Sequence, residues 1–239
     1  DFLVTAYVAD VNDTNSGAFY LISGGTGSRL NQGNPVSGDG LRSMLGYSFA
    51  LLGEHRHPGT GNADGIVKFA VGAPFDSTLF PWGGKVSIYR YDAASDVVIE
   101  ETAIYGDAPG EAFGAGLGAF DDDGDGYLEL AVGAVGANSL GGEVHILRGN
   151  WAGNSFEMEH LDTLAGGAPG DLFGYSILSA GDVFHNDGRH ELLVGAPYAD
   201  MSGSLQGAIV LFLNHNLVLA LTSGENNALF GWDIDGGLD

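Results

Sequence analysis

Acidic side chains in one short stretch have the spacing of a cation-binding loop. Asp121, Asp123 and Asp125 occupy alternate positions, a glycine comes next, and Glu129 stands at the ninth position. Hard cations such as Ca²⁺ take six to eight oxygen ligands, and alternating acids in a tight loop can point at one centre. The backbone carbonyl of Tyr127 can supply a further oxygen. The spacing therefore predicts a calcium site in preference to Mg²⁺, and the alternative is a solvated acidic turn.

Weaker versions of this loop recur along the chain. One has acids and an amide at comparable positions, which predicts a second calcium site from Asp182, Asn186 or Asp187, and Glu191. Another spans the two ends of the chain and forms a site only if the ends meet. Its candidate ligands are Asp233, Asp235, Asp239 and Asp1.

A further copy has a basic residue in place of the closing acid. Asn62 and Asp64 persist, but Lys68 stands where Glu129 stands in the first loop. An ammonium group beside a carboxylate balances its charge as a metal ion would. We therefore expect the lysine to replace the ion in this copy.

The phrases that flank these loops repeat at a nearly constant spacing. An apolar residue followed by Gly precedes each loop, at residues 45, 113, 173 and 230. A Gly-Ala phrase follows the loop, as in Gly72-Ala73-Pro74 and Gly195-Ala196-Pro197. A period of roughly 60 residues indicates one supersecondary unit that buries its apolar face by stacking on its copies.

Each unit reads as four short strands that hold the loop between the first and the second. In the best copy we expect these strands at Phe113 to Phe120, Leu128 to Ala134, Gly141 to Leu147 and Glu157 to Leu164. The glycines fall at turns, and no helical periodicity is convincing, so the pattern favours an all-β fold. Four-stranded units repeated around an axis make a β-propeller.

The two ends of the chain complete each other in this scheme. The C-terminal phrase looks like a first strand and an acidic loop, and Asp1 to Ala6 looks like a second strand. We therefore predict a single domain over 1–239, with about four blades and one blade shared by both ends. The repeats lie near 1–40 plus 228–239, 41–105, 106–165 and 166–227. The alternative is that the ends pair between molecules.

The phrases resemble the FG-GAP repeats known from the integrin α-chain β-propeller. The resemblance rests on Phe113-Gly114, Phe173-Gly174 and Phe230-Gly231, and on the two Gly-Ala-Pro phrases. It implies calcium in some loops between first and second strands, on the lower face of the propeller. It also implies partner contacts on the opposite face, from the loops Phe75 to Pro81, Val135 to Leu140 and Tyr198 to Leu205. Integrin propellers have seven blades, whereas this chain has material for four, and Val135 stands where the other phrases have proline.

Composition narrows the class of protein. The chain has 239 residues and a formal net charge of −23, so nucleic acid and anionic membranes would repel it. No apolar run reaches the ~18 residues of a membrane span. Cysteine is absent, which excludes disulfides and thiolate zinc sites. The acidic balance suits a calcium-rich or saline exterior, so we expect a secreted or cell-surface protein; the plainer alternative is an acidic protein kept soluble by its charge.

The first functional hypothesis is a calcium-binding module for adhesion or assembly, with a protein or glycan ligand on the upper face. Loops on a rigid scaffold are natural contact surfaces. The aromatic side chains of Phe75, Phe80 and Trp82 form a candidate contact patch in one loop. The alternative is that these rings pack over a blade edge.

Two other hypotheses remain open. Similar repeats occur in some lyases and lipases, and His55 and His57 flank Arg56 as a conceivable acid–base or metal pair. A polar surface loop is the simpler interpretation, and no nucleophile motif or phosphate loop is present. The third hypothesis is a structural subunit that assembles through shared blades.

Overall fold

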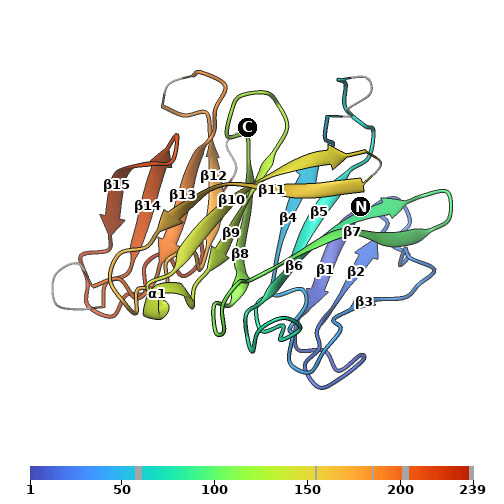
Figure 1. Cartoon of the computed structure of the whole chain (residues 1–239), viewed down its shortest axis with the longest axis horizontal. Coiled ribbons are helices and arrows are strands. Elements are labelled where there is room, and N and C mark those ends of the chain that lie inside the picture. The colour runs from blue at the N-terminus through green and yellow to red at the C-terminus, as the bar shows by residue number, and fades with distance from the viewer. Residues whose placement is uncertain (57–60, 154, 185, 201–204, 237–239) are drawn as a thin grey trace.

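A computed structural model describes residues 1–56, 61–153, 155–184, 186–200 and 205–236. The strands form four antiparallel sheets that stand side by side in chain order (Figure 1). The first sheet contains β1 (Phe2–Ala6), β2 (Ala18–Ile22) and β3 (Val36–Ser37). The second contains β4 (Ser48–Gly53), β5 (Lys68–Ala73), β6 (Lys85–Asp92) and β7 (Val97–Tyr105).

The third and fourth sheets repeat the same meander. The third contains β8 (Phe113–Phe120), β9 (Glu129–Ala134), β10 (Glu143–Ala152) and β11 (Ser155–Ala165), with the short α1 (Ala137–Leu140) between β9 and β10. The fourth contains β12 (Ile177–Gly181), β13 (Glu191–Ala196), β14 (Ala208–Leu213) and β15 (Asn216–Thr222). The all-β class and the four-stranded unit predicted from the repeats are confirmed, in a propeller-like arrangement.

The hydrophobic cores lie between neighbouring sheets. Phe19 and Val71 pack between the first and second sheets, and Leu52 and Leu130 between the second and third. Phe120 and Val194 pack between the third and fourth. Each buried side chain of this size contributes about 1.5–3 kcal/mol. The sheets therefore stabilise one another face to face, with β8 packed against both β4 and β12.

Paired glycines explain the recurring phrases. Gly114 and Gly174, the glycines after phenylalanine, have φ of 90° and 91°, a region that side chains disfavour. Gly133, of the Gly-Ala phrase, lies against the next sheet, where an added Cβ would stand 2.0 Å from the carbonyl oxygen of Gly174. One glycine supplies the backbone conformation and the other supplies the close approach.

The C-terminal phrase begins like a further unit. Phe230 forms a bridge with Gly207, as Phe113 does with Gly84. The Ser176 hydroxyl donates to the Gly231 carbonyl at 2.8 Å, as the Ser48 hydroxyl donates to the Gly114 carbonyl at 2.7 Å between the second and third sheets. Within the described residues, however, β1 pairs only with β2. The sharing of one blade between the ends stays a prediction.

Among the described residues, no helix is long and apolar enough to cross a membrane.

Candidate metal centre

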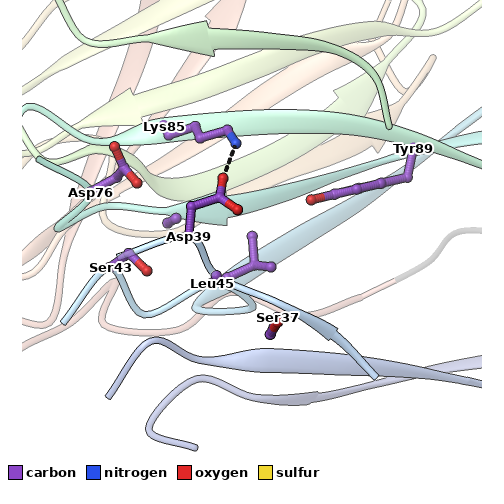
Figure 2. A pocket seen from close by; sticks show the side chains of 9 residues that line it. Ser37, Asp39, Ser43, Leu45, Asp76, Lys85 and Tyr89 are labelled. Carbon is purple, nitrogen blue, oxygen red and sulfur yellow. Dashed lines mark hydrogen bonds and ion pairs between the residues drawn. The ribbon is translucent and has the colours of Figure 1, made fainter. Parts of the chain in front are cut away.

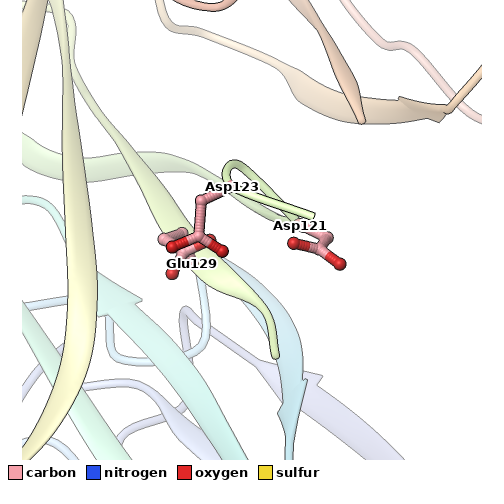
Figure 3. Close-up of side chains that lie close together, drawn as sticks. All are labelled: Asp121, Asp123 and Glu129. Carbon is pink, nitrogen blue, oxygen red and sulfur yellow. The ribbon is translucent and has the colours of Figure 1, made fainter. Parts of the chain in front are cut away.

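The β8–β9 loop (121–128) and the first residue of β9 bring three carboxylates together. Asp121, Asp123 and Glu129 each offer an oxygen, and these oxygens lie within 4.8 Å of one another (Figure 3). Asp121 and Glu129 are buried and Asp123 is half-buried. Carboxylates this close repel one another unless a cation balances them. The geometry can therefore hold a metal ion.

Asp121 also shapes the loop. Its Oδ1 accepts hydrogen bonds from the N–H groups of Gly124 (2.8 Å) and Asp125 (3.1 Å), and its Oδ2 accepts from Gly126 (2.8 Å). Three backbone donors on one carboxylate fix the turn in which the other acids stand. The loop is thus pre-organised by one of its own candidate ligands.

Two arginines reach the same loop. Arg148, on β10, donates from Nη2 to Asp123 Oδ2 (2.6 Å) and from Nε to Glu129 Oε1 (3.1 Å). Arg56, from the β4–β5 loop (54–67), donates to Asp125 Oδ2 at 3.0 Å and lies over the Tyr127 ring. The predicted ligand Asp125 is therefore engaged by a neighbouring sheet and stands outside the three-carboxylate group. Residues 121–129 carry five carboxylates, and the two guanidinium groups engage three of them.

Glu129 is the most perturbed acid of the site. Burial raises its pKa to about 7, even though the Asp122 N–H and Arg148 donate hydrogen bonds to it. A bound divalent cation would favour the charged form and reverse this effect. Protonation of Glu129 would therefore oppose the binding of a cation.

Histidines from the fourth sheet support this loop, and the acid spacing gave no signal for them. His215 contacts Asp122 Oδ1 through Nε2 and Asp162 Oδ2 through Nδ1, each at 2.8 Å. The hydrogen bond to Asp122 is the main cause that raises the pKa of His215. The His190 N–H donates to the Asp121 carbonyl at 2.7 Å, and the Asp121 N–H donates back to His190 Nδ1 at 3.2 Å.

The β12–β13 loop (182–190) places its acids differently. The Val183 N–H donates to Glu191 Oε2 at 2.8 Å, and the Gly188 N–H donates to Asp182 Oδ2 at 2.7 Å. Among the described residues, Glu191 Oε1 and Asp182 Oδ1 are buried without a hydrogen-bond partner. Asn186 and Asp187 are exposed. The two acids that close the loop are thus turned inward, and the second site stays a prediction.

Lys68, the first residue of β5, places its ammonium group on a carboxylate of the β4–β5 loop. Lys68 is fully buried and forms an ion pair with the buried Asp64, and its ammonium lies 4.7 Å from the centre of the Phe156 ring. His55 is also buried, edge-on to Phe156. Burial lowers its pKa to about 4. Its assignment to a polar surface loop was wrong, and His57 lies outside the described residues.

The acids predicted at the ends of the chain stand apart. Asp233 and Asp235 line a cavity of about 620 Å³ along with Tyr7, Tyr175 and Trp232. Asp1 does not line it but accepts a hydrogen bond from the Gly24 N–H at 2.9 Å. Asp239 lies outside the described residues. The split site is therefore not assembled in the described part of the chain.

The predicted aromatic patch divides in two. Phe80 and Trp82 are exposed, by 37% and 62%, and the neighbouring Leu79 is exposed by 60%. Phe75 instead turns its ring edge towards Tyr47, at 6.3 Å between centroids. Only Phe80 and Trp82 are presented to solvent as a pair.

The other lysine, Lys85, joins the first and second sheets. Figure 2 shows its ammonium on Asp39, at 3.0 Å, in a small cavity that Asp76 and Tyr89 also line. It also pairs with Glu100 at 3.1 Å. Both lysines are thus buried and paired with acids, but only the partner of Lys68 is itself buried.

Comparisons with known proteins agree with the repeat pattern, although no protein-family model matches the chain. Integrin alpha-7 of Rattus norvegicus is 30% identical over 186 residues, which is 72% of this chain and 15% of the relative. Integrin alpha-7 of Homo sapiens is 29% identical over 226 residues, 86% of this chain and 17% of the relative. Phosphatidylinositol-glycan-specific phospholipase D of Rattus norvegicus is 29% identical over 192 residues, 75% of this chain and 22% of the relative. The chain spans less than a quarter of the length of these relatives.

Proposed function

Because the chain is homologous to integrin α chains and carries their FG-GAP repeats, we propose that it is a calcium-binding adhesion module of the cell exterior. In this proposal the four sheets are blades of a propeller, and one blade is shared by both ends. The approach of Asp121, Asp123 and Glu129 to within 4.8 Å carries the calcium assignment.

Calcium fits the donors that this loop offers. The candidate ligands are all oxygens, and Ca²⁺ accepts more of them, in a more flexible geometry, than Mg²⁺ does. The ion would join the start of β9 to the end of β8, so its binding free energy would add to the stability of the third sheet.

Calorimetric titration and native mass spectrometry with calcium, each with a chelator control, test this proposal. We expect the wild-type chain to bind at least one ion at this loop, and Asp123→Asn to lose it. Glu225→Gln removes the same charge from an exposed position after β15 and serves as the matched control. Equal binding by wild type and Asp123→Asn would refute the assignment.

For the adhesion role, we propose a protein ligand that contacts the exposed pair Phe80 and Trp82. Aromatic side chains presented on a loop are frequent anchors of protein interfaces. Substitution of both rings by alanine should abolish ligand capture while calcium binding persists. A glycan ligand would be revealed if binding depended on the sugar and not on the protein that carries it.

A second candidate function is a module attached to a secreted lipid- or polysaccharide-acting enzyme. The similarity to phosphatidylinositol-glycan-specific phospholipase D favours it. Binding to vesicles that carry glycosylated phosphatidylinositol, and none to vesicles without it, would support this candidate over adhesion.

Assembly through shared blades is the third candidate. It is favoured by β1, which pairs on one side only in the described residues, and by Phe230, which is held like the start of another unit. In the native mass spectra, monomers with bound calcium would support closure within one chain. Multimers that dissociate in chelator would support closure between chains.

A further inference from the structure

Arg148 stands between two candidate ligands of the β8–β9 loop. Its guanidinium donates to Asp123 Oδ2 at 2.6 Å and to Glu129 Oε1 at 3.1 Å. The other Glu129 oxygen already accepts the Asp122 N–H at 2.9 Å. The arginine therefore supplies positive charge at the place where a metal ion would supply it.

A comparison of the second, third and fourth sheets shows the role of Arg148. Lys68, Glu129 and Glu191 are the first residues of β5, β9 and β13. The register of each hairpin sets Arg90, Arg148 and Leu213, respectively, at or next to the facing position of the third strand. In the fourth sheet, where that residue is leucine, Glu191 Oε1 is buried without a partner among the described residues. In the third sheet Arg148 fills this role.

Arg148 has room to leave. Its side chain is 37% exposed and lines a cavity of about 200 Å³ with Arg56 and Asn150. A long, flexible side chain at such an edge can keep its stem in place while its charged head moves to water. An incoming ion can thus take over the two carboxylates without a change in the strands.

We propose that Arg148 is a resident counter-cation of the β8–β9 loop, which calcium must displace from Asp123 and Glu129, and that Arg148 thereby sets the affinity of this loop. The inference rests on the proposed calcium function. A guanidinium and a calcium ion on the same two carboxylates would lie close enough to repel each other strongly. The two cations therefore compete for Asp123 and Glu129.

Arg148→Met tests the proposal, because methionine keeps an unbranched stem and removes the charge. We expect the dissociation constant for calcium at this loop to fall about tenfold or more. Arg148→Lys keeps a charge without the two-pronged geometry, and it should lie between wild type and Arg148→Met. The matched control is Arg90→Met in the second sheet, where Arg90 pairs with Glu101 and not with a cation loop.

A second readout separates competition from support of the loop. In chelator, Arg148→Met should unfold at a lower temperature than wild type, because buried Glu129 loses its partner. In saturating calcium the difference should close or reverse. A structural prop would lower both the stability and the calcium affinity.

The outcomes distinguish the two proposals. If wild type binds calcium at this loop and Arg148→Met binds it equally or more weakly, the competition is refuted and the calcium function stands. If neither chain binds more ions than Asp123→Asn does, both proposals fail. Both proposals are supported only if Arg148→Met binds calcium at this loop more tightly than wild type does.

Discussion

The β8–β9 and β12–β13 loops are built alike and balanced differently. In both, the strand after the loop opens with a buried glutamate that accepts an N–H from the second loop residue, at 2.9 Å in one and 2.8 Å in the other. The remaining oxygen of Glu129 meets Arg148, whereas that of Glu191 meets no donor among the described residues. The β4–β5 loop goes further and replaces the acid by Lys68. At the first residue of the strand after the loop, the three copies thus have a lysine, a glutamate paired with an arginine of the next strand, and a glutamate with one oxygen unpartnered among the described residues.

This series teaches that the acids alone do not decide which loop binds an ion. A buried carboxylate needs a counter-charge. A loop that obtains this charge from a side chain of the protein gains less free energy from binding a metal ion. We therefore expect calcium to bind the β12–β13 loop more readily than its lower acid count suggests. The richer β8–β9 loop must first release Arg148.

The largest effect should come from the loop whose counter-charge is built in. Lys68→Met leaves the buried Asp64 without its partner, which costs about 3–5 kcal/mol. Urea unfolding in the presence and absence of calcium measures it, and calcium should not restore the loss. Lys85→Met is the control, because its partners Asp39 and Glu100 are 67% and 38% exposed and can be solvated. Equal losses in the two variants would break the comparison.

The next effect concerns Glu191, whose buried Oε1 accepts no hydrogen bond among the described residues. Glu191→Gln replaces a buried carboxylate whose Oε1 has no partner among the described residues, so the stability in chelator should rise by about 1–2 kcal/mol. The stabilisation that calcium gives to wild type should shrink at the same time. Glu129→Gln is the matched change in the loop that has an arginine, and it should give no such gain. A loss of stability for Glu191→Gln in chelator would contradict this view.

The most gradual effect is the pH dependence of the β8–β9 loop. Burial raises the pKa of Glu129 from 4.5 to about 7, so between these values the folded chain holds a proton that the unfolded chain has lost. The contribution of this group to the stability of the metal-free protein therefore falls as pH rises through that interval. Below about pH 7, calcium must displace this proton. The affinity of the loop for calcium should therefore fall by up to about tenfold for each pH unit by which the pH is lowered. Calorimetric titrations across this range measure it, and Glu129→Gln should flatten both slopes.

The sequence shows which acids lie close together, and it shows their counter-charges only where these are near along the chain. Regular spacing identified Asp121, Asp123 and Glu129, because one short loop carries all three. Lys68 was found in the same way, since it takes the place of the closing acid. Arg148 lies a strand away, and only the pairing of β9 with β10 brings it to Glu129. No spacing rule contains that pairing.

The fold shows the same division. The recurring glycines predicted sheets of four strands, because each glycine answers a local demand of the backbone. Where the two ends go depends on contacts across the whole assembly, and the phrase at Phe230 does not encode its partner. The burial of His55 was missed for a related reason, because its environment is formed by Phe156 of another sheet.

The hydrogen bonds between His190 and Asp121 have one more consequence. They tie the backbone at the start of one loop to the backbone at the end of the next, and Arg56 makes a similar tie to Asp125 from the other side. The β8–β9 loop is therefore connected to the β4–β5 loop on one side and to the β12–β13 loop on the other. Disorder in any one of these loops removes contacts that hold the adjacent loop, so the order of the three loops is coupled.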